Sequence, residues 1–264
     1  MRTFNPRLSV SVNRKGVLDV DSVKGCFHGM NKYPNGGCYG LCYAARMAKA
    51  RGYDFSKSVS RLIHPDDTYR IAEIVDRHES SWFRVGTMGD PCHDWPLTVK
   101  ICEWLGKFKA PVIITKHWIK IDDSLLGRLA RINSVVNTSI SPLDSEDEIE
   151  HRLQQHFRVK SFGIKAVLRI VSAKFQDDDA RNEVQKRLFE IVPNIDNPLR
   201  IPNSDERVLS GEISVMNRQD INKQSSISVA NKTAYIGTCL NCPDQCGSQE
   251  ERGWRRREWQ LSLF

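Results

Sequence analysis

Residues 24–48 read Lys-Gly-Cys-Phe-His-Gly-Met-Asn-Lys-Tyr-Pro-Asn-Gly-Gly-Cys-Tyr-Gly-Leu-Cys-Tyr-Ala-Ala-Arg-Met-Ala, and this stretch decides how the rest of the chain is interpreted. Its three cysteines, Cys26, Cys38 and Cys42, lie in a segment rich in glycine, with asparagine and proline between them. A β-type run precedes them at residues 16–23, and a helical pattern follows at residues 43–49. This order predicts a metal-binding loop that joins a strand to a helix.

The number of cysteines indicates which kind of metal centre the loop could hold. A closed structural zinc site uses four protein ligands, whereas a catalytic centre leaves one position open. A [4Fe-4S] cluster that is bound by three thiolates keeps one iron available for another ligand. A zinc half-site is the alternative, because Cys38 and Cys42 are four residues apart and could share one face of a helix.

Composition predicts a soluble globular protein. The chain has 264 residues, enough for one large α/β domain, and 40% of them are hydrophobic. A net charge of +7 and a pI near 9.0 favour a polyanionic partner such as nucleic acid, although an ordinary soluble enzyme can carry the same charge. No signal peptide or membrane span is visible, so we expect a cytoplasmic protein without a membrane partner. In a reducing compartment, eight cysteines are expected to be metal ligands rather than disulfide partners.

Short apolar runs alternate with amphipathic helical patterns up to about residue 204, which predicts successive β/α units and a parallel sheet. The composition then becomes more polar. We therefore expect an α/β domain over residues 1–204 and a C-terminal extension over residues 205–264. The expected strands are 17–23, 82–86, 111–115, 134–140, 164–171 and 199–201, and the expected helices are 43–51, 66–78, 96–107, 122–131, 144–157 and 177–191.

The three-cysteine loop resembles that of radical S-adenosylmethionine (SAM) enzymes. The segment Gly-Cys-Tyr-Gly-Leu-Cys-Tyr-Ala-Ala-Arg-Met-Ala, residues 37–48, is similar to the Cys-Tyr-Ala segment of spore photoproduct lyase and of small phage and bacterial relatives. The spacing is Cys-x11-Cys-x3-Cys, which departs from the common Cys-x3-Cys-x2-Cys.

This resemblance implies a partial (β/α)6 barrel, a [4Fe-4S] cluster on Cys26, Cys38 and Cys42, and SAM as the second cofactor. It also implies a reductant such as flavodoxin or ferredoxin, and the host cytoplasm as the location if the protein is phage-encoded. Function in such barrels lies at the carboxyl ends of the strands. The residues at those ends are therefore the candidates for the rest of the site.

The second expected strand ends in Gly-Thr-Met-Gly-Asp-Pro, residues 86–91. Glycines let the backbone approach a ligand closely. Met88, Gly89 and Asp90 resemble the element that binds the amino group of SAM in radical SAM enzymes. The alternative is a strand-to-helix turn in which Asp90 caps the next helix. We interpret His93, in the same loop, as a loop residue rather than as a ligand.

Polar residues at the next two strand ends are further candidates for SAM contacts. Lys116 could meet the SAM carboxylate or a substrate anion, and a surface lysine is the alternative. Asn137, Ser139 and Ser141 alternate on one face of the fourth strand. They could bind the ribose or the carboxylate of SAM, or they could fill the barrel.

Three other residues are candidates for the reaction site. Arg169 lies in an otherwise apolar strand, where a charge is costly without a partner. We expect that partner to be SAM, the substrate or an internal acid such as Asp90. No residue is an obvious radical-quenching donor, and Cys92 and Tyr43 are the first candidates for that catalytic role.

The C-terminal extension contains a second cysteine set with the spacing Cys-x2-Cys-x3-Cys, made of Cys239, Cys242 and Cys246. This spacing indicates a metal site. It could hold an auxiliary iron–sulfur cluster, as in several radical SAM groups, or zinc with Cys92, Cys102 or a histidine as fourth ligand. Arginines and tryptophans at residues 252–259 suit phosphate contact and base stacking, or else they dock the terminus and face solvent.

The leading hypothesis is a radical SAM enzyme of isomerase or lyase type that cleaves SAM to a 5'-deoxyadenosyl radical. The resemblance and the basic tail indicate a nucleic-acid base as substrate, for example a modified thymidine in phage DNA. A small molecule or a peptide remains open as substrate. The rival is a non-catalytic, zinc-dependent nucleic-acid-binding protein, which would lack the visible absorption of an iron–sulfur cluster.

Overall fold

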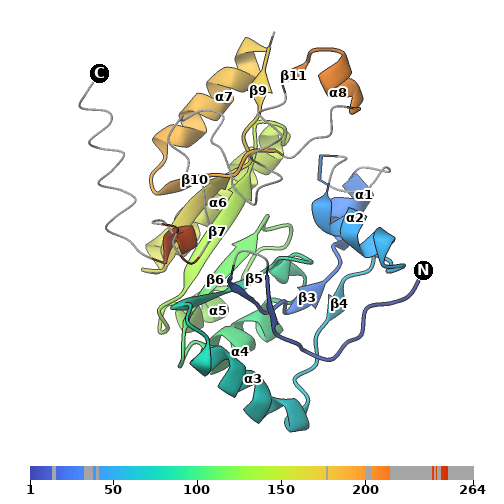
Figure 1. Ribbon diagram of the computed structural model, residues 1–264. Coiled ribbons are helices and arrows are strands. Elements are labelled where there is room, and N and C mark those ends of the chain that lie inside the picture. The colour runs from blue at the N-terminus through green and yellow to red at the C-terminus, as the bar shows by residue number, and fades with distance from the viewer. Residues whose placement is uncertain are drawn as a thin grey trace.

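The computed structural model describes residues 1–13, 16–32, 38–39, 42–176, 178–199, 204–214, 240, 242 and 245–248, and Figure 1 shows their arrangement. The strands are β1 (Ser11–Val12), β2 (Leu18–Asp19), β3 (Val23–Lys24), β4 (Val59–Ser60), β5 (Trp82–Val85), β6 (Ala110–Thr115), β7 (Val135–Ile140), β8 (Lys165–Ile170), β9 (Lys174–Phe175), β10 (Asn194–Asp196) and β11 (Ile213–Ser214). The helices are α1 (Phe27–Lys32), α2 (Tyr43–Ala50), α3 (Pro65–Arg77), α4 (Trp95–Leu105), α5 (Asp123–Leu129), α6 (Glu146–Ser161), α7 (Asp179–Glu190) and α8 (Glu206–Leu209), with short 3-10 turns η1 (Pro91–Asp94) and η2 (Gln245–Gly247).

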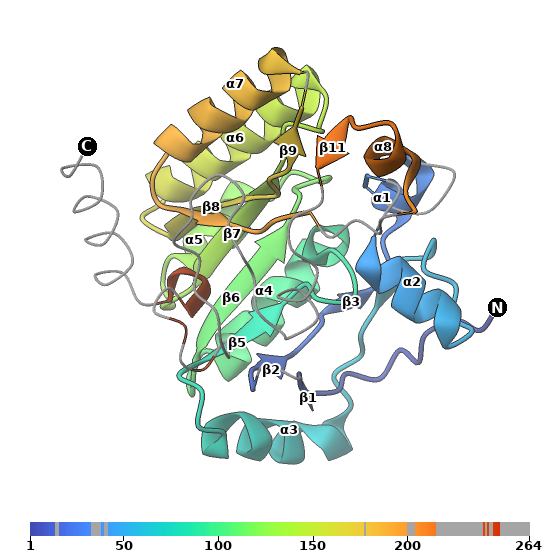
Figure 2. The ribbon, with the colours of Figure 1, turned by 45° about the horizontal axis from the view of Figure 1, so that its top comes forward.

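Seven strands form one sheet in the order β1-β2-β5-β6-β7-β8-β10. The neighbouring strands from β2 to β10 are parallel, and β1 pairs antiparallel with β2. Helices connect successive parallel strands, and the colours cross the sheet in chain order from β2 onwards (Figures 1 and 2). The predicted alternation of strands and helices around a parallel sheet is therefore confirmed.

The sixth parallel strand differs from the prediction. It is β10, at residues 194–196, whereas the sequence pattern placed it at residues 199–201. Residue 199 lies outside any strand, and residues 200 and 201 lie outside the described residues. Because β10 reads Asn-Ile-Asp, it has a single apolar residue, and hydrophobic periodicity cannot identify so short a strand. The partial barrel itself stays a prediction.

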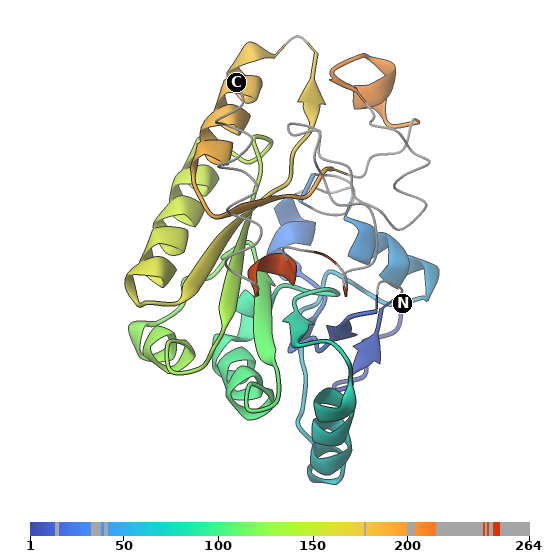
Figure 3. The same cartoon turned by 60° about the vertical axis from the view of Figure 1, so that its left-hand side comes forward.

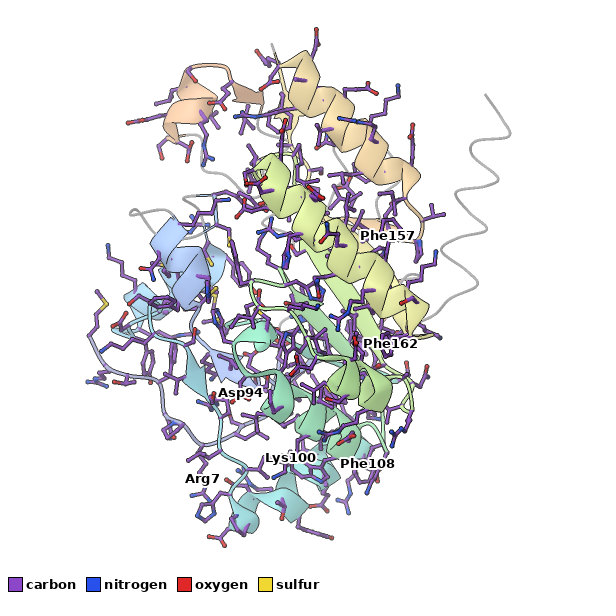
Figure 4. The ribbon with its side chains drawn as sticks, turned by 180° about the vertical axis from the view of Figure 1, so that it is seen from behind. Arg7, Asp94, Lys100, Phe108, Phe157 and Phe162 are labelled. Atoms are coloured by element: carbon purple, nitrogen blue, oxygen red, sulfur yellow. The ribbon has the colours of Figure 1, made fainter. Side chains whose placement is uncertain are left out.

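The two faces of the sheet have different coverings. Helices α4, α5 and α6 lie against one face, seen from behind in Figure 4. The main core lies under them and includes Ile113 and Val136. Successive strand residues point to opposite faces, so Val112 and Val135 belong to a smaller core on the other face. None of the helices formed by the described residues is both long and apolar enough to cross a membrane.

Segments of the expected C-terminal extension pack against the preceding part of the chain. Strand β11 pairs antiparallel with β9, and Ile213 is buried against Phe175. The turn η2 lies against the face opposite α4 to α6, where Gly247 approaches Val135 and Val167 (Figure 3). The boundary at residue 205 stays a prediction, and these contacts mean that the described parts on its two sides share cores.

We predict that Gly86→Ala lowers the free energy of unfolding by at least about 1–2 kcal/mol. Gly86 has a φ of 100°, and a Cβ at this position would lie 2.2 Å from the carbonyl oxygen of Ile114. The control is Gly127→Ala in α5, where a Cβ would meet nothing within 4 Å. It should raise stability by up to about 1 kcal/mol. Equal effects in urea titrations of both variants would contradict the prediction.

Candidate metal and cofactor site

The cysteine loop places two of its thiols around one point. Cys26 precedes α1, and Cys42 is the N-cap residue of α2. A Cβ built on Gly29 of α1 would lie 2.9 Å from Sγ of Cys26 and 3.2 Å from Sγ of Cys38. The absence of a side chain on Gly29 therefore leaves space between two sulfur atoms. Cys26 and Cys42 also share an apolar cluster with Phe55.

Burial raises the pKa of each of these three thiols. For Cys26 the next causes are the charges of Asp90 and Cys38. The pKa of Cys38 rises to about 11, because burial outweighs the effect of the neighbouring Lys116. Burial likewise raises the pKa of Cys42. A metal centre would supply the positive charge that stabilises all three as thiolates.

The thiols fit a cluster better than a single ion. Across the described parts of the chain, no three His, Cys, Asp or Glu side chains form a group that could hold a metal ion. A single zinc ion would hold each sulfur ligand at a Zn–S distance of about 2.3 Å, and all of them around one centre. In a [4Fe-4S] cluster each thiolate binds a different iron, so the sulfur atoms stay farther apart. The space at Gly29, between Sγ of the buried Cys26 and Sγ of the half-buried Cys38, is compatible with that second arrangement.

A buried ion network lies beside Cys38. Nζ of Lys116 donates a hydrogen bond to the hydroxyl of Tyr39 and lies 3.6 Å from Oδ1 of Asp144. Asp144 also pairs with Arg152, and both of these side chains are 1% exposed. Nε of Arg152 donates to the backbone oxygen of Lys116 at 3.0 Å. Lys116 is therefore a buried member of the network, which contradicts the alternative of a surface lysine.

The same network joins the cysteine loop to α6. Lys32, at the end of α1, pairs with Glu148 of α6. Glu148 also closes a capping box with Ser145, which fixes the start of α6. Burial lowers the pKa of Lys116, and the charge of Asp144 opposes that change. The loop is thus held by charged contacts to an element more than a hundred residues later in the chain.

Asp90 acts as a cap, which was the alternative interpretation. Its Oδ1 accepts hydrogen bonds from the hydroxyl of Thr115 at 2.6 Å and from the backbone N–H of Cys92 at 3.1 Å. Its Oδ2 accepts from the backbone N–H of Lys116 at 2.8 Å. Both oxygens of this buried carboxylate thus join the loop after β5 to β6. The expected contact of Asp90 with the SAM ammonium stays a prediction. Asp90 is also not the partner of Arg169.

Met88 and Gly89 lie where β3 meets the loop after β5. The N–H of Gly25 donates to the oxygen of Met88 at 2.9 Å, and Gly25 and Gly89 form a parallel bridge. A Cβ on Gly89 would lie 2.4 Å from the oxygen of Val23. Contact between two backbone segments therefore requires the glycine, and the SAM contact expected at Met88 and Gly89 stays a prediction.

Asn137 and Arg169 contact η2, a partner that the sequence did not predict. Nδ2 of Asn137 donates to the oxygen of Cys246 at 2.9 Å, and Oδ1 of Asn137 is buried without a partner among the described residues. Nη1 of Arg169 lies 3.7 Å from Sγ of Cys246, and its Nη2 donates to Asn197 at 3.1 Å. Ser139 is the register partner of Arg169. Part of the face expected to bind SAM therefore holds Cys246.

Two further candidates are buried. Ser141 is fully buried, and its hydroxyl donates to the oxygen of Val171 at 2.7 Å, so it fixes a loop. Cys92 is 1% exposed in the main core, and burial raises its pKa. Their expected roles, a SAM contact for Ser141 and hydrogen donation for Cys92, stay predictions. Tyr43 remains a candidate because it is 45% exposed. Its hydroxyl donates to the oxygen of Thr87 at 2.6 Å.

Histidines lie closer to the cysteine loop than the sequence indicated. His93 stacks on His28 of α1, with ring centroids 4.9 Å apart. His28 also stacks on Trp118, which follows β6. Burial lowers the pKa of His93. His93 is therefore part of the wall beside Cys26's helix, although the sequence placed it only in a loop.

Sequence reasoning missed Tyr39, Asp144 and Arg152 as members of the site. One signal could have found the last two. Asp144, Glu148 and Arg152 are spaced by four residues, which favours an acid–base cluster at the start of α6, where Asp144 directly precedes the N-cap Ser145. Tyr39 offered no such signal, because its hydroxyl finds Lys116 only after the sheet has formed.

The second cysteine set is described only in part. Cys239 and the basic segment at residues 252–259 lie outside the described residues. Cys246 packs on the face opposite α4 to α6, whereas Cys92 and Cys102 lie in the core under those helices. Their expected role as a fourth zinc ligand beside Cys246 is therefore corrected. A second metal centre stays a prediction.

Comparison with known proteins identifies the fold. No family model matches the sequence, and no curated protein matches it. A solved structure of a spore photoproduct lyase double mutant, with bound AdoMet and dinucleoside spore photoproduct, matches with a TM-score of 0.52. The two sequences are 14% identical, and the match covers 96% of this chain and 76% of that chain. At this identity the likeness shows a shared fold.

We predict that Asp144→Asn lowers the free energy of unfolding by about 3–5 kcal/mol, because it leaves buried cations without their counter-ion. The control is Asp123→Asn. Asp123 also pairs with an arginine, Arg158, but its side chain is 71% exposed. Exposed pairs contribute little, so denaturant titration should show a much smaller loss. Equal losses in the two variants would contradict the importance of the buried network.

The pH dependence of stability should also change in Asp144→Asn. Burial alone would raise the pKa of Asp144, but the charges of Lys116 and Arg152 outweigh burial and lower it. A carboxyl with a lowered folded pKa contributes stability above its unfolded pKa of about 4 and loses it as the pH falls further. The parent should therefore lose stability more steeply than Asp144→Asn in acid. Parallel pH profiles would contradict the lowered pKa.

Proposed function

We propose that this protein is a radical SAM enzyme whose cluster is bound by Cys26, Cys38 and Cys42. The observation that carries this proposal is the convergence of Cys26 and Cys38 on the space left by Gly29, at the carboxyl end of a parallel sheet. Sites of α/β enzymes lie at that end. The shared fold with spore photoproduct lyase supports the same assignment.

When bound, a [4Fe-4S] cluster would supply the electron that cleaves SAM to methionine and a 5'-deoxyadenosyl radical. The chain's own residues would hold and enclose these cofactors. Three protein thiolates leave one iron for SAM. Cys26 is buried, and it packs with Ala44, Ala45 and Phe55 in one apolar cluster, which limits the access of water to its thiol.

Arg169 is the strongest remaining candidate for a contact to a bound anion. In the described part of the chain its partners are Asn197 and the thiol of Cys246, and both are neutral acceptors. Neutral partners satisfy its N–H groups without compensating the charge. We propose that Arg169 and Ser139 face the carboxylate of SAM or of the substrate, and that Met88 and Gly89 border that space.

We propose a nucleic-acid base as the substrate. The net charge of +7 supports a polyanionic partner, and the matched lyase structure holds a dinucleoside spore photoproduct. An isomerase or lyase reaction on a modified thymidine, as in phage DNA, is the narrower form of this proposal. A reductant such as flavodoxin or ferredoxin would supply the electron. The second cysteine set, Cys239, Cys242 and Cys246, would hold an auxiliary cluster or zinc.

Cysteine replacement tests this function. We expect Cys26→Ala, Cys38→Ala and Cys42→Ala each to lose the iron and the visible absorption that belong to this cluster after anaerobic reconstitution, because each removes a cluster ligand. Each should also abolish 5'-deoxyadenosine formation from SAM and dithionite. The matched control is Cys102→Ala, another buried cysteine, which lies in the main core and should retain iron and activity.

Two outcomes would count against the proposal. Retention of SAM cleavage in one of the three variants would remove that cysteine from the site. Zinc without iron in the purified protein, together with no visible absorption after reconstitution, would instead support the zinc-dependent nucleic-acid-binding protein.

A further inference from the structure

A basic cleft of about 320 Å³ lies between the N-terminal segment, β3, α2 and α3. Figure 4 shows Arg7, on the N-terminal segment, near α3. The charged residues that line the cleft are Arg7, Lys24, Arg51, Arg61, Asp67 and Arg70. Five cations therefore face one acid among the described residues of this lining. The imbalance makes the cleft a place where an anion would be stabilised.

The acid and the buried arginine do not remove this imbalance. Asp67 is shared by Arg7 and Arg70, so one carboxylate meets two guanidinium groups. Arg61 is 3% exposed, and it donates to the backbone oxygens of Asn5 and Arg7. Its Nε is buried without a partner among the described residues. Neutral oxygens satisfy N–H groups but leave the positive charge of Arg61 in place.

Lys24 and Arg51 complete the basic wall. Neither has a carboxylate within ion-pair distance in the described part of the chain. Lys24, Arg51 and Arg61 carry charges of the same sign and line one cleft, so they repel one another across it. A bound anion would relieve that repulsion.

The cleft also adjoins the candidate metal site. Phe4, Ala48 and Met88 line it, and the same side chains belong to the apolar cluster that contains Cys26 and Cys42. The basic cleft and the cysteine loop therefore border the same apolar cluster. A ligand with a charged part and a reacting part could use both places.

We propose that this cleft binds a phosphate group and that it receives a phosphate of the nucleic-acid substrate. Lys24 and Arg51 contact the phosphate oxygens, and Arg61 adds a fixed charge behind them. Only the source of the phosphate, a nucleic-acid substrate, rests on the proposed function. Phosphate binding itself is argued from the charged residues of the cleft. A free phosphate and a backbone phosphodiester share the recognised chemistry.

The test compares two double variants of the reconstituted full chain. Lys24→Gln/Arg51→Gln removes two cations from the cleft. Lys107→Gln/Lys160→Gln removes two exposed lysines that precede β6 and β8, at the amino-terminal ends of these strands. Fluorescence anisotropy measures binding of a labelled oligothymidine over a range of salt concentrations. Iron content and cooperative unfolding show that both variants are folded.

We expect the cleft variant to bind about tenfold more weakly, with a salt dependence reduced by about 1.4 for two lost contacts to a single strand. The control should stay within about twofold of the parent. An equal loss in both variants, or no loss in the cleft variant, would overturn the proposal.

Inorganic phosphate, added at constant ionic strength, separates the two sources. If it competes with the oligothymidine and raises the melting temperature of the parent alone, the cleft takes free phosphate. If it does neither while the cleft variant still binds the oligothymidine weakly, the cleft takes a backbone phosphodiester. Because oligonucleotide binding requires no SAM cleavage, a failure of the radical SAM assignment would appear separately, as absent 5'-deoxyadenosine.

Discussion

Burial of charge beside the cysteine loop is the constraint on which the candidate site depends. Removing an ion from water costs several kcal/mol, and that cost is met only when partners and geometry are correct. Here the ions come from separate places: Lys116 follows β6, Asp144 precedes α6, and Arg152 lies within α6. Tyr39, next to Cys38, joins them through Lys116. The position of Cys38 therefore depends on ion pairs formed by residues after β6 and in and before α6.

Different segments lie at the two ends of the parallel strands. At the amino-terminal ends of β7 and β8, Gly247 of η2 approaches Val135 and Val167 so closely that a Cβ would lie 2.5 Å from Val167. At the carboxyl ends, the backbone of β3 lies against the loop after β5. Ser139, two residues after Asn137, is nearer to that second end. The face opposite α4 to α6 is therefore covered by η2 where the strands begin, and the segment that leads into the cysteine loop lies where the strands end.

Most of the fold follows from apolar runs, whereas the site needs contacts between distant residues. Four of the six parallel strands, β5 to β8, lie where hydrophobic patterns predicted them, because burial on both faces favours apolar residues. The expected strand 17–23 is divided into β2, in the parallel sheet, and β3, which pairs with β4 in another sheet. The pattern failed at β10, where Asn194 and Asp196 flank one isoleucine. Asp90 shows why the roles of side chains are harder to predict, because a cap and a ligand-binding carboxylate look alike in sequence. The position of Arg169 in an apolar strand indicated that its side chain needs a partner. The sequence could not indicate that Cys246 is one of its partners.

Net charge acquires meaning only when the paired ions are set aside. Arg84 is held by Asp19, and Arg128 by Glu103, so these cations compensate acids within the fold. The cations of the cleft outnumber its acid, and Arg61 has only neutral acceptors there. Phosphate recognition tolerates water, whereas a reactive radical requires its exclusion. An apolar wall between basic cleft and thiols would let one polyanionic substrate meet both conditions, since its phosphates could stay hydrated while its base enters the drier side.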